Sequence, residues 1–369
     1  MLFDINPKEY RKDLYDREGE LEEILDALKL GERLLILYGI RRVGKSSLLR
    51  VALREAGVPH AIVDVRRIYF EYGAVSREAL YRSILEYFTR NLGLLEKAGF
   101  KARDALSRIK GIHLTELGFE VEPLAPLPSS AELLSRIDEW CRRHGLRFVM
   151  AFDEAQYLRF GGVTKYDGII AWSIDNLPGI TFILTGSEVG LLKDFLRLSD
   201  PQAPLFGRYR REILVTRFTR HQSIDFLHRG FTELGVATKM DELEEAVDIL
   251  DGIAGWLTYY GYYRAVRGLP HREALNMVFE EGSKLVLSEL SNVIAPSRRR
   301  YSAILKAVAS GATTWSDIKA YVIARTGRIT DKRFTELLKR LVKYGYLAKE
   351  RDRYMIPDPV VKHACRLLR

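Results

Sequence analysis

The fold of this chain is decided by the stretch Gly39-Ile40-Arg41-Arg42-Val43-Gly44-Lys45-Ser46-Ser47. The apolar run before it, at 34–38, is typical of a buried parallel strand, and the run after it, at 48–53, has apolar residues spaced for a helix packed on a sheet. Strand, loop and helix in this order are the setting in which G-x-x-x-x-G-K-[ST] marks a phosphate-binding loop. The alternative is a glycine turn that carries a surface lysine, and the flanking strand and helix favour the phosphate-binding loop.

The residue types of this stretch suit a bound polyphosphate. Glycine lets phosphates approach the backbone N–H groups, and the N-terminus of the following helix adds unpaired donors and a partial positive charge. The Lys45 ammonium would then reach the β- and γ-phosphates, and the Ser46 hydroxyl would bind Mg²⁺. The sequence therefore predicts nucleotide binding by nine consecutive residues: Gly39, Ile40, Arg41, Arg42, Val43, Gly44, Lys45, Ser46 and Ser47.

A second apolar run, at 148–152, is followed by two acids, Asp153 and Glu154. Ligands of open α/β sheets bind at the carboxyl ends of the strands, which would place both carboxylates beside the phosphates. Asp153 would hold Mg²⁺, directly or through water, and Glu154 would act as the catalytic base that orients and deprotonates the attacking water. A solvated acidic turn is the alternative, and the phosphate-binding loop earlier in the chain favours the nucleotide site.

Two further residues are candidates for the same site. Thr185 lies at the end of an apolar strand and would sense the γ-phosphate or position the water; alternatively, its hydroxyl only terminates the strand. Arg208 lies on a loop near a sheet edge and would stabilise transition-state charge at the site of an adjoining subunit. For Arg208 the alternative is a basic, solvated loop. The residues alone do not decide between the two interpretations of Thr185 or between the two interpretations of Arg208.

The order of strand and helix patterns predicts the domain organisation. Strand-like runs alternate with helical patterns up to about residue 216, which predicts an α/β fold of the P-loop NTPase type with a doubly wound, mostly parallel sheet. Only helical patterns follow, and then three helices and a hairpin typical of a winged helix. The predicted parts are a P-loop ATPase domain at 1–216, a helical lid domain at 217–296 and a winged-helix domain at 297–369.

Positive charge is concentrated in the last of these parts. The formal net charge is +9, but residues 297–369 hold 18 Lys and Arg against 6 Asp and Glu, so this part carries +12 and the first 296 residues carry −3. Such clustering favours duplex DNA as a partner, and the alternative is a winged helix that packs on protein. The candidate nucleic-acid residues are Lys332, Arg333, Lys339, Arg340, Lys343, Arg351 and Arg353.

Composition excludes several other classes of protein. The apolar fraction, 47%, is ordinary for a globular protein, and we find no run of eighteen apolar residues and no signal-peptide pattern. The two cysteines, Cys141 and Cys365, lie far apart and in no metal-binding spacing. We therefore expect a cytoplasmic protein with free thiols and no membrane partner.

The loop, the acidic strand end and the domain layout together resemble the archaeal ATPase family, within the AAA+-related STAND group of P-loop ATPases. Residues 39–46 are similar to its Walker A motif, 148–154 to its Walker B, 183–187 to its sensor strand and 204–208 to its Pro-Leu-x-Gly-Arg loop. The family has a helical lid, whose motif carries proline where this chain has Ala254, and a C-terminal winged helix. The resemblance implies ATP or ADP with Mg²⁺, an archaeal source, and adenine contacts by the opening motif, which begins with Tyr15, Asp16 and Arg17.

These observations lead to one main functional hypothesis and two alternatives. The main hypothesis is a Mg²⁺-dependent ATPase whose lid and winged helix move with the nucleotide state. The first alternative is a slow nucleotide-gated switch, which would act through a nucleotide-dependent homo-oligomer or through a protein partner of the winged helix. The second is a DNA-binding module that ATP regulates.

Overall fold

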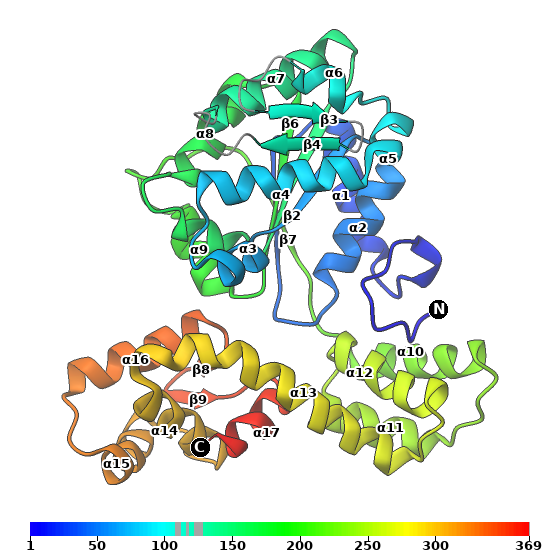
Figure 1. The fold of residues 1–369 in the computed structure, drawn as a ribbon. Coiled ribbons are helices and arrows are strands. Elements are labelled where there is room, and N and C mark those ends of the chain that lie inside the picture. Colours follow the sequence, from blue (N-terminus) through cyan, green and yellow to red (C-terminus); the bar gives the residue numbers. More distant parts are fainter. Residues whose placement is uncertain (108–111, 116–117, 122–127, 369) are drawn as a thin grey trace. The chain divides into compact units, whose positions relative to one another are not determined.

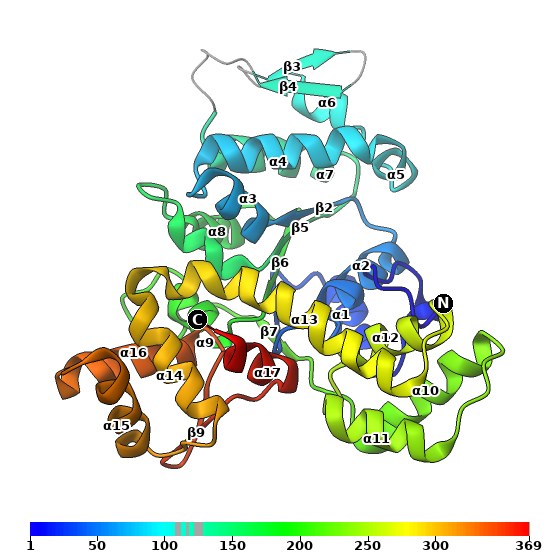
Figure 2. The same cartoon turned by 60° about the horizontal axis from the view of Figure 1, so that its bottom comes forward.

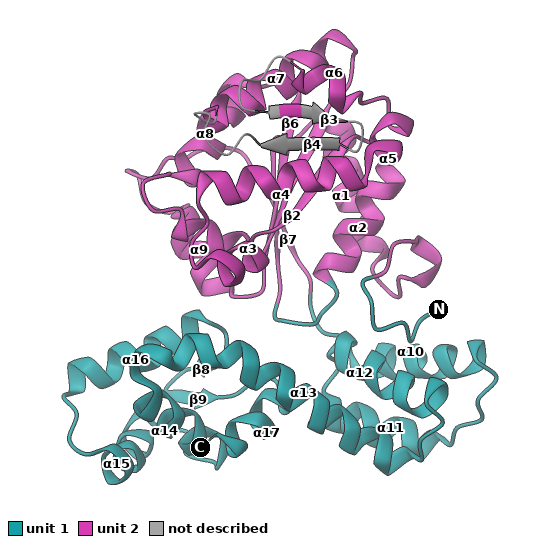
Figure 3. Ribbon diagram, in the orientation of Figure 1, with its two compact units in different colours: residues 1–7, 40–44, 216–369 teal, residues 8–39, 45–215 magenta. Residues whose placement is uncertain are grey.

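The computed structural model describes residues 1–107, 112–115, 118–121 and 128–368. These residues form two compact units, which are coloured separately in Figure 3 and described one at a time below. The sheet unit comprises Lys8–Gly39 and Lys45–Val215. The helical unit comprises Met1–Pro7, Ile40–Gly44 and Thr216–Arg369.

A five-stranded parallel sheet forms the centre of the sheet unit (Figure 1). Its strands lie in the order β2-β5-β6-β1-β7, so the strand before the phosphate-binding loop pairs with β6 on one side and β7 on the other. The predicted doubly wound sheet is confirmed. The strands are β1 (Leu34–Tyr38), β2 (His60–Asp64), β5 (Phe148–Asp153), β6 (Ile180–Gly186) and β7 (Arg211–Leu214).

The strand order determines which helices cover each face. The chain crosses the sheet in one direction from β1 to β2 and returns in the other from β2 through β5 and β6 to β7. Because such crossovers are right-handed, α2 (Lys45–Ala56) covers one face and α7 (Ser130–Arg143) and α8 (Tyr166–Asn176) cover the other. All side chains of β1 and β6 are buried, as expected for strands covered on both faces.

Serine side chains cap the N-terminal ends of two helices in this unit. Helix α4 is capped by Ser76, whose hydroxyl accepts a hydrogen bond from the Ala79 N–H. Helix α7 is capped by Ser129, whose hydroxyl accepts the Glu132 N–H. The other elements are α1 (Glu18–Leu30), α3 (Val65–Tyr72), α4 (Arg77–Arg90), α5 (Leu92–Lys97), α6 (Ala102–Leu106), α9 (Val189–Leu196), the 3-10 turns Arg11–Asp13 and Ala155–Phe160, and the hairpin of β3 (Ile112–Thr115) and β4 (Gly118–Val121).

The first part of the helical unit consists of four helices and the N-terminal segment. The ring of Phe3 is fully buried and packs on Phe231 at 4.9 Å between ring centroids. It fills space that glycine leaves open, since a Cβ on Gly230 or Gly261 would lie 2.2–2.3 Å from this ring. The helices are α10 (Arg220–Glu233), α11 (Met240–Leu250), α12 (Ala254–Gly261), which continues as a π-helical turn at Tyr262–Val266, and α13 (His271–Ile294).

The second part of the helical unit confirms the predicted winged helix. It contains the three predicted helices and the two-stranded hairpin. A fourth helix, α17, which the sequence analysis did not predict, follows the hairpin and packs along α13 (Figure 2). Among the described residues, no helix has the length and apolar character needed to cross a membrane. The elements are α14 (Arg298–Ala309), α15 (Trp315–Thr326), α16 (Asp331–Lys343), β8 (Ala348–Glu350), β9 (Arg353–Met355) and α17 (Pro359–Leu367), with a 3-10 turn at Ala295–Ser297 before α14.

Candidate functional site

Three predicted site residues meet at the carboxyl ends of the central strands. The Ser46 hydroxyl, in the first turn of α2, donates a hydrogen bond of 2.7 Å to Oδ2 of Asp153, the last residue of β5. The hydroxyl of Thr185 on β6 donates to the other carboxylate oxygen, Oδ1. The Thr185 Oγ1 also accepts the backbone N–H of Glu154 at 3.2 Å. The structure thus brings together residues of all three sequence motifs.

The oxygen atoms of this cluster fit a magnesium ion. Ser46 and Asp153 are both half-buried and supply a hydroxyl oxygen and a carboxylate. Mg²⁺ binds oxygen ligands, keeps several waters and usually takes only one or two protein groups together with substrate phosphates. The residue types present fit Mg²⁺, and binding of the ion by Ser46 and Asp153 stays a prediction.

Lys45 is folded back onto the strand that leads to its own loop. Its side chain is 95% buried, and Nζ donates to the carbonyl oxygen of Gly39 at 2.9 Å. Gly44, directly before it, has a φ of 102°, a backbone conformation that side chains with a Cβ rarely adopt. The glycine thus permits the sharp turn that brings the ammonium over the loop backbone.

The Glu154 carboxylate is held by three donors. Its Oε2 accepts the Ser187 hydroxyl at 2.7 Å, the Ser187 backbone N–H at 3.2 Å and Nε2 of Gln156 at 2.6 Å. Glu154 itself adopts the left-handed conformation, with a φ of 56°, which turns the chain sharply after β5. The predicted base therefore lies at the strand end as expected, but its carboxylate is bound to the tip of β6.

A second, fully buried carboxylate lies behind this arrangement. Glu188 accepts the Tyr157 hydroxyl at 3.4 Å and Nε2 of Gln156 at 3.5 Å, so one amide reaches the carboxylates of both Glu154 and Glu188. Sequence reasoning missed Glu188. The available signal was weak: an acid two residues after the apolar strand that ends in Gly186.

The loop residue Arg42 lies in the helical unit, where it contacts α12. Its guanidinium lies over the ring of Trp256 at 4.1 Å, and its carbonyl oxygen accepts the Gly255 N–H at 2.8 Å. Trp256 is fully buried and donates Nε1 to Oδ2 of Asp358 at 2.9 Å. Asp358 in turn caps α17 through the backbone N–H of Val360 at 2.8 Å. A chain of contacts therefore runs from the phosphate-binding loop to the last helix.

Arg41 makes a second set of contacts within the helical unit. It forms an ion pair with Glu289 on α13, and its guanidinium lies 5.2 Å from the ring centre of Tyr346, which precedes the β8–β9 hairpin. Neither partner was identified from the sequence, because both lie more than two hundred residues further along the chain. The two loop arginines thus contact three separate parts of the helical unit.

The candidate adenine residues lie where α1 begins. Arg17 is the residue before the helix, is almost fully buried and pairs with Glu20 at 3.3 Å; burial lowers the pKa of its guanidinium. Asp16 has a φ of 49°, and Tyr15 is half-buried. The adenine contact that the resemblance implied for these residues remains a prediction.

Arg208 is bound within its own unit. Nε and Nη2 donate to the two carboxylate oxygens of Asp175 at 3.0 and 2.5 Å, and Nη1 donates to the carbonyl oxygen of Pro204. The hydrogen bonds to Asp175 raise the pKa of Arg208. This bidentate ion pair holds the loop against the end of α8.

The candidate nucleic-acid residues lie on one side of α16 and on the hairpin. The apolar face of α16 is buried, and all seven candidate side chains are exposed. Arg333 pairs with Glu336 at 3.3 Å, and Arg351, at the hairpin turn, has a φ of 53°. The basic residues are Lys332, Arg333, Lys339, Arg340, Lys343, Arg351 and Arg353.

Comparison with known families agrees with this arrangement. Residues 14–259 match a family described as an ATPase domain predominantly from Archaea. The chain belongs to this archaeal ATPase family. Residues 296–356 match a second family, the C-terminal winged helix-turn-helix domain of MCM proteins. The match confirms the resemblance given by the Walker motifs.

Two solved structures extend the comparison. The Walker-type ATPase PABY2304 of Pyrococcus abyssi is 37% identical, with a TM-score of 0.83 over 99% of this chain and 100% of the other. The ORC2 protein of Aeropyrum pernix, solved as ADPNP-ADP complexes, shares the fold at 16% identity, with a TM-score of 0.62 over 99% of this chain and 97% of the other. No curated protein sequence matches this chain.

Proposed function

We propose that this protein binds ATP with Mg²⁺ and hydrolyses it. The observation that carries the proposal is the meeting of Ser46, Asp153 and Thr185 at the strand ends, in a member of an ATPase family. When bound, Mg²⁺ neutralises charge on the phosphates as the transferring phosphoryl group leaves. Asp153 and Ser46 would hold the ion. The Lys45 ammonium would release the carbonyl oxygen of Gly39 and donate hydrogen bonds to phosphate oxygens instead.

The three hydrogen bonds on Oε2 of Glu154 bear on how fast hydrolysis would be. A carboxylate that accepts three hydrogen bonds is a weaker base than a free one, because those bonds favour its charged form. The contacts of Glu154 with Ser187 and Gln156 therefore support a slow enzyme, which was the first alternative from the sequence. Turnover would rise when the carboxylate rotates toward the attacking water.

The contacts of Arg41 and Arg42 support coupling to the rest of the chain. Residues 40–44 continue directly into Lys45 and Ser46, so any change of loop backbone on nucleotide binding displaces the two arginines. Within the helical unit, such a change would alter the stacking on Trp256 and the ion pair with Glu289. We propose that these contacts transmit the nucleotide state to α13 and α17.

Duplex DNA is a second part of the proposal, supported by the basic side of α16. An exposed helix and hairpin with this charge suit a recognition helix in the major groove and a wing on the phosphate backbone.

A nucleotide-dependent homo-oligomer is a third part of the proposal. In it, Arg208 would leave its ion pair with Asp175 and contact the nucleotide bound by a neighbouring copy of the chain.

Steady-state ATP turnover of the purified full chain tests the central proposal. We expect Lys45→Ala to lose nucleotide binding, and Glu154→Gln to bind Mg²⁺·ATP while turnover falls by about a hundredfold or more. Glu96→Gln is the matched control, because Glu96 is an exposed acid on α5 and takes no part in the site. Unchanged turnover in Glu154→Gln would show that another group activates water, and unchanged ATP affinity in Lys45→Ala would remove the site itself.

A further inference from the structure

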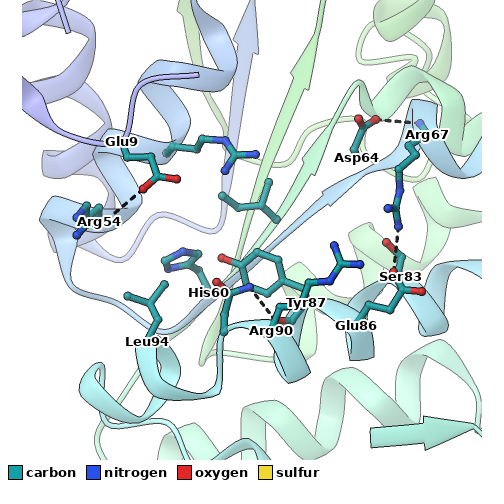
Figure 4. Close-up of a pocket in the computed structure, with 13 residues that line it drawn as sticks. Glu9, Arg54, His60, Asp64, Arg67, Ser83, Glu86, Tyr87, Arg90 and Leu94 are labelled. Carbon is teal, nitrogen blue, oxygen red and sulfur yellow. Dashed lines mark hydrogen bonds and ion pairs between the residues drawn. The ribbon is translucent and has the colours of Figure 1, made fainter. Parts of the chain in front are cut away.

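A second cavity lies in the sheet unit beside the edge strand β2 (Figure 4). Its volume is about 520 Å³, and it is lined by residues of α2, β2, α3, α4 and α5 together with Glu9 and Asn91. Among the described strands, β2 pairs with β5 alone, so it forms an edge of the sheet. None of the nucleotide-site candidates lines this cavity, and its volume is within the range of small-molecule sites.

Two of the four arginines that line the cavity are already neutralised. Arg54 pairs with Glu9 at 3.5 Å, and its guanidinium stacks on Tyr10 at 4.0 Å. Arg67 pairs with Glu86 at 3.0 Å, and these pairs are drawn in Figure 4. Salt bridges of this kind fix the orientation of the side chains and leave little net charge on that part of the wall.

The other two arginines form no salt bridge with the described acids. Arg50 lies on α2 and Arg90 ends α4, and both are exposed. Within the described part of the chain, neither guanidinium has a hydrogen bond or an ion pair with an acidic side chain. Two guanidinium groups on one cavity offer several parallel N–H donors, the arrangement that binds a phosphate dianion.

Apart from Asp64, which accepts the backbone N–H of Arg67 at 2.9 Å, the remaining polar lining is neutral and suits hydroxyl groups. His60 is buried, and its Nδ1 lies 2.8 Å from the carbonyl oxygen of Val58, which assigns the proton to Nδ1 and leaves Nε2 as an acceptor. The ring of Tyr87 lies 6.0 Å from that of His60, and burial raises the pKa of its hydroxyl to about 12, so it stays protonated. Ser83 and Asn91 complete the neutral lining.

We propose that this cavity binds a small phosphate monoester with a hydroxylated body, its phosphate held by Arg50 and Arg90 and its hydroxyls bound by His60, Tyr87 and Asn91. Asp64 also lines the cavity, and its carboxylate would repel the successive phosphates of a nucleic acid strand. A single phosphate avoids that repulsion. Because α2 also carries Lys45 and Ser46 in its first turn, a ligand on Arg50 contacts the helix that begins the nucleotide site.

Calorimetric titration of the full chain, saturated with Mg²⁺·ADP to fill the nucleotide site, tests this proposal. We expect ribose 5-phosphate to bind with one-to-one stoichiometry and more tightly than inorganic phosphate. The double variant Arg50→Gln/Arg90→Gln should bind at least tenfold more weakly, because each removed guanidinium takes charge-assisted hydrogen bonds with it. Arg82→Gln is the matched control, since Arg82 is exposed on α4 but does not line the cavity, and its affinity should equal that of the parent.

Three outcomes would overturn the proposal. Equal affinity of the parent and the double variant would exclude the two arginines, provided that unchanged melting temperatures show both proteins to be folded. Affinity for ribose 5-phosphate no greater than for inorganic phosphate would exclude recognition of the hydroxylated body. Binding of a single-stranded oligonucleotide that depends on Arg50 and Arg90 and displaces ribose 5-phosphate would assign the surface to nucleic acid instead.

Discussion

The hydroxyl of Ser187 donates a hydrogen bond of 2.7 Å to the carboxylate of Glu154, and the backbone N–H of Ser187 reaches the same oxygen at 3.2 Å. Ser187 follows β6 and Glu154 follows β5, so two neighbouring strand ends hold the predicted base in place. The position of Glu154 in the sequence suggested a carboxylate ready to accept a proton. In the structure, one oxygen of this carboxylate, Oε2, already accepts hydrogen bonds from Ser187 and Gln156.

Replacing Ser187 by alanine should therefore raise the rate of ATP hydrolysis. The lost hydrogen bond is worth about 1.5 kcal/mol or less, so we expect kcat to rise by roughly threefold to tenfold, with little change in the affinity for ATP. Ser187→Thr keeps the hydroxyl and should behave like the parent. Steady-state turnover with saturating Mg²⁺·ATP gives the measurement, and a fall in kcat for Ser187→Ala would mean that Ser187 positions the base for reaction.

The sequence predicted the sheet and its nucleotide motifs because these features depend on neighbouring residues. The run before Gly39 and the acids after Phe152 can each be recognised within about ten residues of chain. The contact of Arg42 with Trp256 could not be predicted in this way, because nothing near Arg42 indicates an aromatic partner more than two hundred residues away. The contact of Trp256 with Asp358 could not be predicted either, because Asp358 caps α17, a short helix that begins with Pro359 and was not expected.

Gly255 gives a direct test of the contact between the loop and α12. A Cβ at this position would lie 2.8 Å from Cβ of Arg42 and 3.1 Å from its carbonyl oxygen, too close for the present backbone. Gly255→Ala should displace the loop and weaken ATP binding by about tenfold, an effect of about 1.4 kcal/mol. Gly19→Ala is the control, because a Cβ there meets nothing within 4 Å. Equal ATP affinities of the two variants, measured by titration, would show that the loop tolerates the extra atom.

Asp358 should make the stability of the helical unit depend on pH. Burial raises the pKa of this carboxyl group above its ordinary value, so the folded state binds a proton more tightly than the unfolded chain does. This contribution to stability is therefore present at low pH and is lost as the pH rises through the folded-state pKa.

Asp358→Asn removes the titrating group and keeps an acceptor for the N–H groups of α17. We expect the difference in melting temperature between the variant and the parent to shift in favour of the variant as the pH rises from 4 to 8. Asp352→Asn serves as the control, because Asp352 is exposed at the β8–β9 turn. A difference that does not change with pH would mean that Asp358 has the same pKa in the folded and unfolded states.

The basic side of α16 gives the prediction for DNA. Each Lys or Arg that contacts a phosphate contributes about −0.9 to the slope of log affinity against log salt concentration. Lys332→Gln/Lys339→Gln removes two exposed charges from this side and should reduce the steepness of that slope by about 1.8 while weakening binding to duplexes of unrelated sequence alike. Lys362→Gln, an exposed lysine on α17, should leave the slope unchanged. If the parent shows a flat response to salt, or if the double variant keeps the full slope, α16 does not contact DNA, and the result favours a winged helix that packs on protein.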